Sequence, residues 1–199
     1  MPEPSVAGLL LAAGAGRRLG QPKALVELDG RPLVDRGITL LRDAGCTPVH
    51  VVLGAAYDQV VAAAALDGAT VVHNRDWRSG MGSSLRAGLA SLPPHVGAVV
   101  VALVDQPRVT GEAVRRLIRA YRSGATVAVA TYDDQPRNPV LLARPTWAAV
   151  AEVAHGDVGA RPFLRAHPDL VTRVPCDDVG SPEDIDTPDD LAALRSGDR

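Results

Sequence analysis

The chain has 199 residues, of which 46% are hydrophobic, 22% are charged and only 3% are aromatic. This length suits one domain covering residues 1–199, with a core built from Ala, Val and Leu. The formal net charge of −2 provides no basic footprint for nucleic acid, and no apolar run approaches the roughly 20 residues that span a bilayer.

The cysteines and the residues near the N-terminus bear on the cellular location that we expect for the protein. Cys46 and Cys176 are the only cysteines, too few for a disulfide framework or a zinc site, and they favour a reduced, cytoplasmic location. The apolar run near the N-terminus carries Glu3 and lacks the basic residues of a signal peptide, so we expect no export.

Apolar runs typical of strands alternate along the chain with amphipathic segments typical of helices. We expect strands over residues 6–13, 48–53, 70–73, 97–104 and 126–130. We expect helices over residues 31–44, 57–66, 83–92 and 110–121, the last of them capped by Thr110. Because residues 97–104 are almost continuously apolar, they predict a central parallel strand that is buried on both faces.

The pattern is looser after residue 130. Pro136, Pro139 and Pro145 indicate an inserted or edge region built over the sheet, and residues 196–199 indicate a frayed tail. The alternation of strands and helices predicts a Rossmann-like, three-layer α/β/α fold with a mostly parallel sheet.

A glycine-rich loop follows the first strand and ends in cations. Glycines let backbone N–H groups approach a ligand closely, and the nearby Arg17, Arg18 and Lys23 suit a polyphosphate. The loop spacing fits neither the dinucleotide fingerprint nor a P-loop. We therefore expect a nucleotide site at the carboxyl end of the first strand, with an ordinary strand-to-helix turn as the alternative.

Two acidic positions are candidates for a metal site. Asp105 directly follows the 97–104 strand, where a carboxylate can hold a hard cation such as Mg²⁺ or cap the next turn. The acidic cluster consists of Asp184, Asp186, Asp189 and Asp190. Thr187 or Asp186 can cap a final helix that begins at Pro188, and the first turn of this helix fully explains Asp189 and Asp190. Capping explains Asp186 less well.

Two further segments admit both ligand contact and a purely structural role, and a third is less transparent. Asn74 and residues 80–84 could approach a base or ribose, or simply cap a helix. Residues 138–140 carry no transparent signal. Residues 156–161 could present backbone N–H groups to a substrate phosphate or form a structural turn.

Residues 11–23 read Leu-Ala-Ala-Gly-x-Gly-x-Arg-x-Gly-x-x-Lys, which resembles the signature loop of the MobA-like nucleotidyltransferases. Matching segments at 80–85, 104–107, 138–140, 156–161 and 184–188 extend the resemblance over nearly the whole chain. The Asp-Gln-Pro, Gly-Asp-x-Gly-Ala-Arg and Asp-Ile-Asp-Thr-Pro segments are most similar to the molybdenum cofactor cytidylyltransferase (MocA) branch. Leu19 departs from the usual methionine.

The resemblance implies roles for residues of this chain. Catalytic roles fall on Arg17, Lys23 and Asp105, with Arg18 a weaker candidate than Arg17, and Mg²⁺ binding falls on Asp105 and Asp186. Nucleotide binding falls on Leu11, Ala12, Ala13, Gly14, Gly16, Arg17, Lys23, Asn74, Gly82 and Ser83. Acceptor binding, in about residues 135–175, falls on Asn138, Pro139, Gly156, Asp157, Gly159 and Ala160.

The resemblance also implies a reaction. The expected activity is Mg²⁺-dependent nucleotidyl transfer from an NTP to a small phosphorylated acceptor, molybdopterin, with release of pyrophosphate. Ala13 stands where the guanylyl branch carries glycine, and its methyl group predicts CTP over GTP. A molybdoenzyme or its maturation factor is the implied protein partner. The alternatives are a sugar-phosphate or phospholactate-type nucleotidyltransferase and a non-catalytic molybdenum-cofactor binding or delivery protein.

Overall fold

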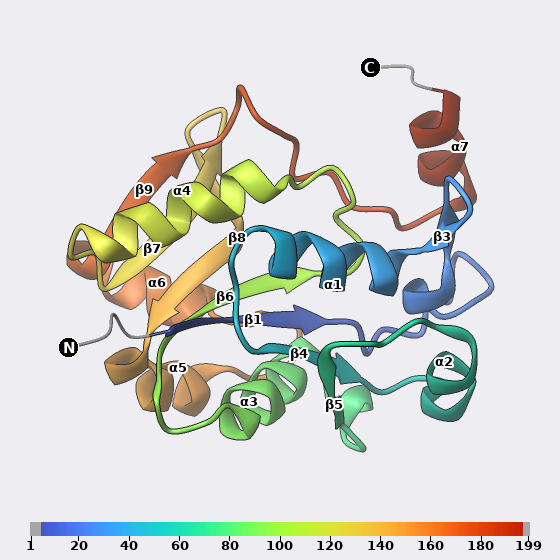
Figure 1. Cartoon of the computed structure of the whole chain (residues 1–199), viewed down its shortest axis with the longest axis horizontal. Helices are drawn as coiled ribbons and strands as arrows, with labels where there is room; N and C mark the ends of the chain where they lie inside the picture. Colours follow the sequence, from blue (N-terminus) through green and yellow to red (C-terminus); the bar gives the residue numbers. More distant parts are fainter. Residues whose placement is uncertain (1–4, 197–199) are drawn as a thin grey trace.

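The computed structural model describes residues 5–196 and contains a seven-stranded sheet with helices on both faces (Figure 1). The strand order is β5-β4-β1-β6-β8-β7-β9. Every pair of neighbours is parallel except the two pairs that include β8, which runs antiparallel to β6 and to β7. The expected three-layer, mostly parallel α/β fold is therefore confirmed.

The strands of the large sheet are β1 (Ser5–Leu11), β4 (Val49–Leu53), β5 (Ala69–His73), β6 (Val96–Leu103), β7 (Val127–Tyr132), β8 (Gln135–Ala143) and β9 (Val171–Pro175). The helices are α1 (Leu33–Asp43), α2 (Tyr57–Ala63), α3 (Met81–Ser91), α4 (Gly111–Arg122), α5 (Trp147–Val153), α6 (Arg161–Ala166) and α7 (Pro188–Ser196). A short hairpin of β2 (Glu27–Leu28) and β3 (Arg31–Pro32) precedes α1.

The core lies in two layers, one on each face of the sheet. In β1, Leu10 packs in the layer beneath α1 and α4, whereas Leu9 and Leu11 pack in the layer beneath α3 and α5 (Figure 1). The same alternation runs through β6, where Val100 and Val101 belong to different layers. Both faces are covered, which explains why these strands are continuously apolar in the sequence.

The prolines after residue 130 do not mark an inserted or edge region, so that expectation is wrong. Pro136 and Pro139 lie within β8, which sits between β6 and β7 inside the sheet. Its second half pairs with both neighbours, and the register between β7 and β8 shifts between Val129 and Ala130. Pro136 lies near the start of the strand and Pro139 lies in this irregular stretch, where a missing N–H disturbs fewer ladder bonds.

The helix caps agree with expectation, whereas the expected tail does not begin at residue 196. Thr110 caps α4 by accepting a hydrogen bond from the Ala113 N–H at 3.4 Å. Thr187 caps α7 in the same way, with the Asp190 N–H as donor at 3.2 Å. Ser196 is the last residue of α7 rather than the start of a tail. Glu3 and residues 197–199 lie outside the described residues.

Candidate functional site

The loop after β1 needs glycine for its own folding. Gly16 has φ of +59°, and a Cβ on it would lie 2.0 Å from the carbonyl oxygen of Gln21. The Leu19 N–H donates to the Gly16 carbonyl at 2.9 Å, so the loop closes on itself. Gly14 has open space around it, and a Cβ there would lie 3.9 Å from Cδ of Lys23. The loop thereby returns Lys23 to the carboxyl end of β1.

Lys23 lies between two carboxylates from distant parts of the chain. Its Nζ is 2.5 Å from Oδ2 of Asp105, which follows β6, and 2.6 Å from Oδ1 of Asp186. The side chains of Lys23 and Asp105 are 17% and 19% exposed, and that of Asp186 is 36% exposed. The structure thus brings together the three residues that the sequence singled out for phosphate and metal binding.

The charges of this group stabilise one another. Burial by itself would lower the pKa of Lys23, but the carboxylates of Asp105 and Asp186 outweigh burial and raise it. The hydrogen bond from Lys23 lowers the pKa of Asp186, and Arg18 adds to this effect. Lys23 and Asp186 are therefore both ionised at neutral pH.

The two arginines of the loop occupy different positions. Arg18 pairs with Asp186, its guanidinium 3.0 Å from Oδ2, whereas Arg17 is exposed on the wall of the cavity. Arg18 is also the residue that matches the arginine of the signature spacing. Arg18 rather than Arg17 contacts Asp186, and the order of the two arginines in phosphate binding stays a prediction.

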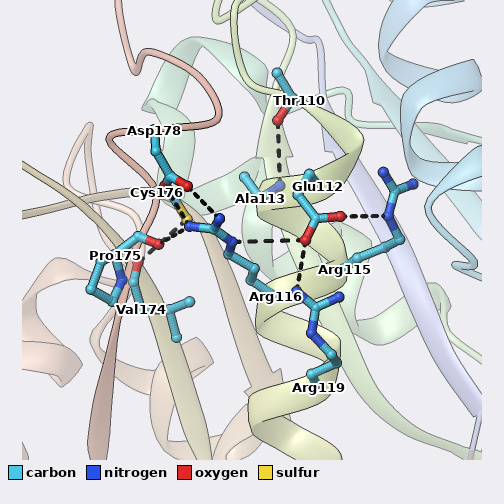
Figure 2. A network of polar contacts seen from close by, with 10 residues as sticks. All are labelled: Thr110, Glu112, Ala113, Arg115, Arg116, Arg119, Val174, Pro175, Cys176 and Asp178. Atoms are coloured by element: carbon cyan, nitrogen blue, oxygen red, sulfur yellow. Dashed lines mark hydrogen bonds and ion pairs between the residues drawn. The ribbon is translucent and has the colours of Figure 1, made fainter.

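Asp186 reaches the site from the C-terminal end of the chain. β9 ends at Pro175, and residues 176–187, which we call the C-terminal strap, lead from there to α7. Arg116 on α4 holds the start of the strap through both carboxylate oxygens of Asp178, at 2.6 and 2.7 Å, and the Pro175 carbonyl, at 2.7 Å (Figure 2). Glu112 lies 3.8 Å from the same guanidinium.

A cavity of about 660 Å³ opens beside these residues. This volume suits a nucleotide-sized ligand. One wall is the glycine loop with its cations, a second is the Asp105 turn with Asp186, and a third comes from the start of α3 and the segment before it. Of the predicted nucleotide-binding residues, the cavity wall includes Leu11, Ala13, Gly14, Gly16, Arg17 and Lys23.

Asn74 and Ser83 lie behind the third wall. Both are buried, and the Asn74 amide donates to the hydroxyls of Ser83 and Ser84 at 2.8 and 2.9 Å. These bonds tie β5 to α3, and neither serine is the N-cap, which is Gly80. Ser84 is the serine that lines the cavity. Nucleotide contact by Asn74 and Ser83 stays a prediction.

Glycines at the start of α3 allow it to pack against the segment before α6. A Cβ on Gly82 would lie 2.5 Å from the Ala154 carbonyl oxygen, and the Gly82 N–H donates to the Gly156 carbonyl at 2.8 Å. Asp157 accepts from the Met81 N–H at 3.3 Å and lines the cavity. A segment predicted to bind the acceptor therefore meets the wall of the cavity that the start of α3 forms.

The other predicted acceptor-binding residues lie elsewhere. Pro139, in β8, lines a separate cavity of about 250 Å³ together with Leu10 and Leu33 of the α1 side. Asn138 precedes it in the same strand. Gly159 packs near Met81, and Ala160 is the N-cap of α6. Their contact with an acceptor stays a prediction.

The two carboxylates fit a divalent cation whose other ligands come from a substrate. Within residues 5–196, no group of three or more His, Cys, Asp or Glu side chains could hold a metal. Asp105 and Asp186 instead converge as a pair on the position of one cation, the Lys23 ammonium. Mg²⁺ is commonly bound in this way, by one or two carboxylates together with substrate phosphates and water.

Sequence reasoning missed Trp77 and Arg78, which line the cavity. A Cβ on Gly54 would lie 2.5 Å from Cβ of Trp77 and 2.9 Å from Cβ of Ala13, so both side chains pack closely against this glycine. The Arg78 guanidinium lies over the indole at 4.6 Å. The only available signal was that Trp77 is one of two tryptophans in an aromatic-poor chain.

Comparisons with known proteins bear on this site and on the whole fold. Residues 8–171 match the family model of the MobA-like NTP transferase domain. The chain is 42% identical to nicotine blue oxidoreductase of Paenarthrobacter nicotinovorans, over 96% of this chain and 97% of that protein. None of the helices described for this chain is long and apolar enough to cross a membrane.

Two solved structures resemble the chain closely. A homologue, from Mycobacterium sp. strain JC1, of the Mycobacterium tuberculosis protein Rv0371c is 35% identical, with a TM-score of 0.84 and 96% of both chains covered. Rv0371c itself, in a complex with manganese, is 31% identical, with a TM-score of 0.82 and coverage of 96% of this chain and 98% of that one.

Proposed function

The chain belongs to the MobA-like NTP transferase family, and from this membership we propose that it transfers a nucleotidyl group from CTP to molybdopterin and releases pyrophosphate. The observation that carries the proposal is the convergence of Lys23, Asp105 and Asp186 beside a cavity of nucleotide size. Sugar-phosphate and phospholactate-type acceptors are the alternatives within the same reaction class. A non-catalytic delivery role is less consistent with the ionised Lys23–Asp186 pair facing that cavity.

In the proposed reaction, a phosphate oxygen of the acceptor attacks the α-phosphorus of the NTP. The new bond joins this oxygen to the α-phosphorus, and the bond between the α-phosphorus and the oxygen bridging to the β-phosphate breaks. The acceptor phosphate is already an anion at neutral pH, so no side-chain base is required. Catalysis then consists of positioning and electrostatic stabilisation.

Each of these tasks, positioning and electrostatic stabilisation, is assigned to particular side chains beside the cavity. Lys23 leaves its carboxylate partners for the phosphate oxygens, on which charge grows as pyrophosphate departs. Arg18 and Arg17, on the wall of the cavity, attract the β- and γ-phosphates. Asp105 and Asp186 would hold a divalent metal, Mg²⁺ or Mn²⁺, which would supply charge neutralisation at the phosphates. The manganese complex of Rv0371c supports a divalent cation in this fold.

The preference for CTP rests on the size of the cavity near Ala13. Ala13 and Trp77 both line the cavity and both pack close to Gly54, so the Ala13 methyl group takes up space on this part of the wall. A pyrimidine needs less room there than a purine. One methyl group is worth about 1–3 kcal/mol of discrimination, so GTP is disfavoured but not excluded.

Acceptor binding is proposed for residues 135–175. Asp157 and Gly156 support this assignment because they adjoin the start of α3, which forms one wall of the cavity. An acceptor held there would face the nucleotide from the side opposite the glycine loop.

The test is pyrophosphate release by the purified protein with each of the four NTPs, a divalent metal and molybdopterin. We expect release to be fastest with CTP. Faster release with GTP would refute the base preference, and release with sugar 1-phosphates but not molybdopterin would refute the acceptor. Absence of pyrophosphate with every NTP and acceptor would refute nucleotidyl transfer.

A second candidate function follows from the name of the relative that is 42% identical along almost its whole length, nicotine blue oxidoreductase. On this alternative the chain transfers electrons to nicotine blue from a reduced co-substrate. Spectrophotometric bleaching of nicotine blue with NADH or NADPH would support it. Bleaching without any pyrophosphate release would favour this function over transfer.

A further inference from the structure

Gln106 follows Asp105 directly and its side chain reaches the C-terminal strap. The residue is 7% exposed, and its Nε2 donates to the carbonyl of Pro182 at 3.0 Å and to Oδ1 of Asp184 at 2.8 Å. Both partners are acceptors, so the amide nitrogen must face them. One side chain therefore binds two residues of the strap.

The other end of the same amide is unpaired. Oε1 of Gln106 is buried and has no hydrogen-bond partner in the part of the chain that the structure describes. Burying a carbonyl oxygen without a partner is unfavourable, and an apolar side chain of similar size would avoid this cost. The favourable contribution of Gln106 thus comes from the two bonds that its nitrogen donates.

The strap lies against the Asp105 turn along several residues. The Ser181 N–H donates to the Arg108 carbonyl at 3.2 Å, and the Ile185 N–H donates to the Asp105 carbonyl at 2.8 Å. Ile185 is 2% exposed and packs in the core. The residues on either side of Ile185 have different partners: Asp184 binds Gln106, whereas Asp186 binds Lys23.

We propose that Gln106 is a positioning residue that fixes the separation of the two metal-binding carboxylates. It holds the strap beside Asp105, so that Asp186 faces the cavity, and it keeps Asp184 turned away from the Lys23 position. The inference rests on the proposed metal site of Asp105 and Asp186. Asp186 is the more exposed of these ligands and lies on the strap, so its placement depends on how the strap is held.

The test measures Mn²⁺ binding without nucleotide, by electron paramagnetic resonance of the free ion. Gln106→Met keeps the volume of the side chain and removes both donated bonds. We expect it to weaken Mn²⁺ binding about tenfold, the lower end of the cost of losing a supporting hydrogen bond around a metal site, because Gln106 acts on Asp186 only through the strap. In turnover, the KM for the metal should rise while kcat at saturating metal changes little.

Arg116→Met is the matched control, because Arg116 also holds the strap, but at its far end on α4 (Figure 2). This variant should lose thermal stability and keep Mn²⁺ affinity within about twofold of wild type, since the two sites are separate. Equal weakening in both variants would mean that Gln106 acts only through the general stability of the strap, which overturns the inference.

The remaining outcomes separate the inference from the proposed function. If Asp105→Asn binds Mn²⁺ as wild type does, the proposed metal site itself is wrong. If Asp105→Asn abolishes binding but Gln106→Met binds normally, the metal site stands and the role of Gln106 is refuted. Should Gln106→Met fail to fold, Gln106→Asn is the second variant. Its side chain is one methylene shorter, so the amide no longer reaches the strap, and Mn²⁺ binding should again be weaker than in wild type.

Discussion

Replacing Lys23 with methionine should tighten metal binding in the absence of nucleotide, although it should slow nucleotidyl transfer. The Lys23 ammonium lies 2.5 and 2.6 Å from the carboxylate oxygens of Asp105 and Asp186. A divalent cation bound to the same oxygens cannot share this position with the ammonium. In the wild-type protein without nucleotide, the metal must therefore displace Lys23.

The size of the effect follows from the two bonds that the metal must break. A hydrogen bond between charged groups contributes about 1.5–3 kcal/mol. The contact with Asp105 is mostly buried, whereas that with Asp186 is partly screened by solvent because Asp186 is 36% exposed. The released ammonium also regains hydration. We expect a net advantage of about 1.4–2.8 kcal/mol for the methionine variant, or about ten- to hundredfold tighter binding.

The assay is a Mn²⁺ titration of wild type, Lys23→Met and Lys23→Arg without nucleotide. Lys23→Arg keeps a cation beside the carboxylates and should bind Mn²⁺ less tightly than Lys23→Met. Adding a non-hydrolysable CTP analogue should reduce the difference in Mn²⁺ affinity between wild type and Lys23→Met, because the triphosphate gives Lys23 another partner. Equal or weaker Mn²⁺ binding by Lys23→Met would show that the ammonium and the metal do not compete for these carboxylates.

Four further substitutions test other parts of the site. Asp105→Asn keeps the shape of the side chain and removes its charge, so turnover should fall about a thousandfold or more at little cost in melting temperature; full activity at saturating metal would disprove its role. Gly16→Ala should destabilise the protein by about 1–3 kcal/mol, because φ is +59° and the new Cβ would meet the Gln21 carbonyl; thermal unfolding should show a larger loss than in Gly20→Ala, where no atom lies within 4 Å. Arg18→Met should lower kcat/KM for the NTP more than Arg17→Met does, since only Arg18 of the two is seen to pair with Asp186; equal losses would indicate a diffuse basic patch. Ala13→Gly should raise kcat/KM for GTP relative to CTP by about tenfold or more, and an unchanged ratio would refute the steric explanation.

The sequence by itself determined the features that depend on neighbouring residues. The continuous apolar runs predicted the buried strands β1 and β6. The position of Asp105 directly after such a run predicted its place at the carboxyl ends of the central strands. Thr110 was recognised as a cap, and Thr187 as one of two candidates beside Asp186, because a cap contacts N–H groups only three residues away. The spacing of the glycine loop carried the family resemblance. Each of these signals is complete within a few residues of sequence.

Only the tertiary structure decided how distant segments meet. Lys23 is 82 residues from Asp105 and 163 residues from Asp186, and no local pattern distinguishes Asp186 from Asp184 as the partner of Lys23. In our proposal, Gln106 decides which of the two aspartates faces Lys23, because its side chain reaches the strap and binds Asp184. Pro136 and Pro139 misled the prediction for the same reason. Proline lowers the local preference for a strand, but the hydrogen bonds that β8 makes with β6 and β7 come from segments elsewhere in the chain and outweigh that preference.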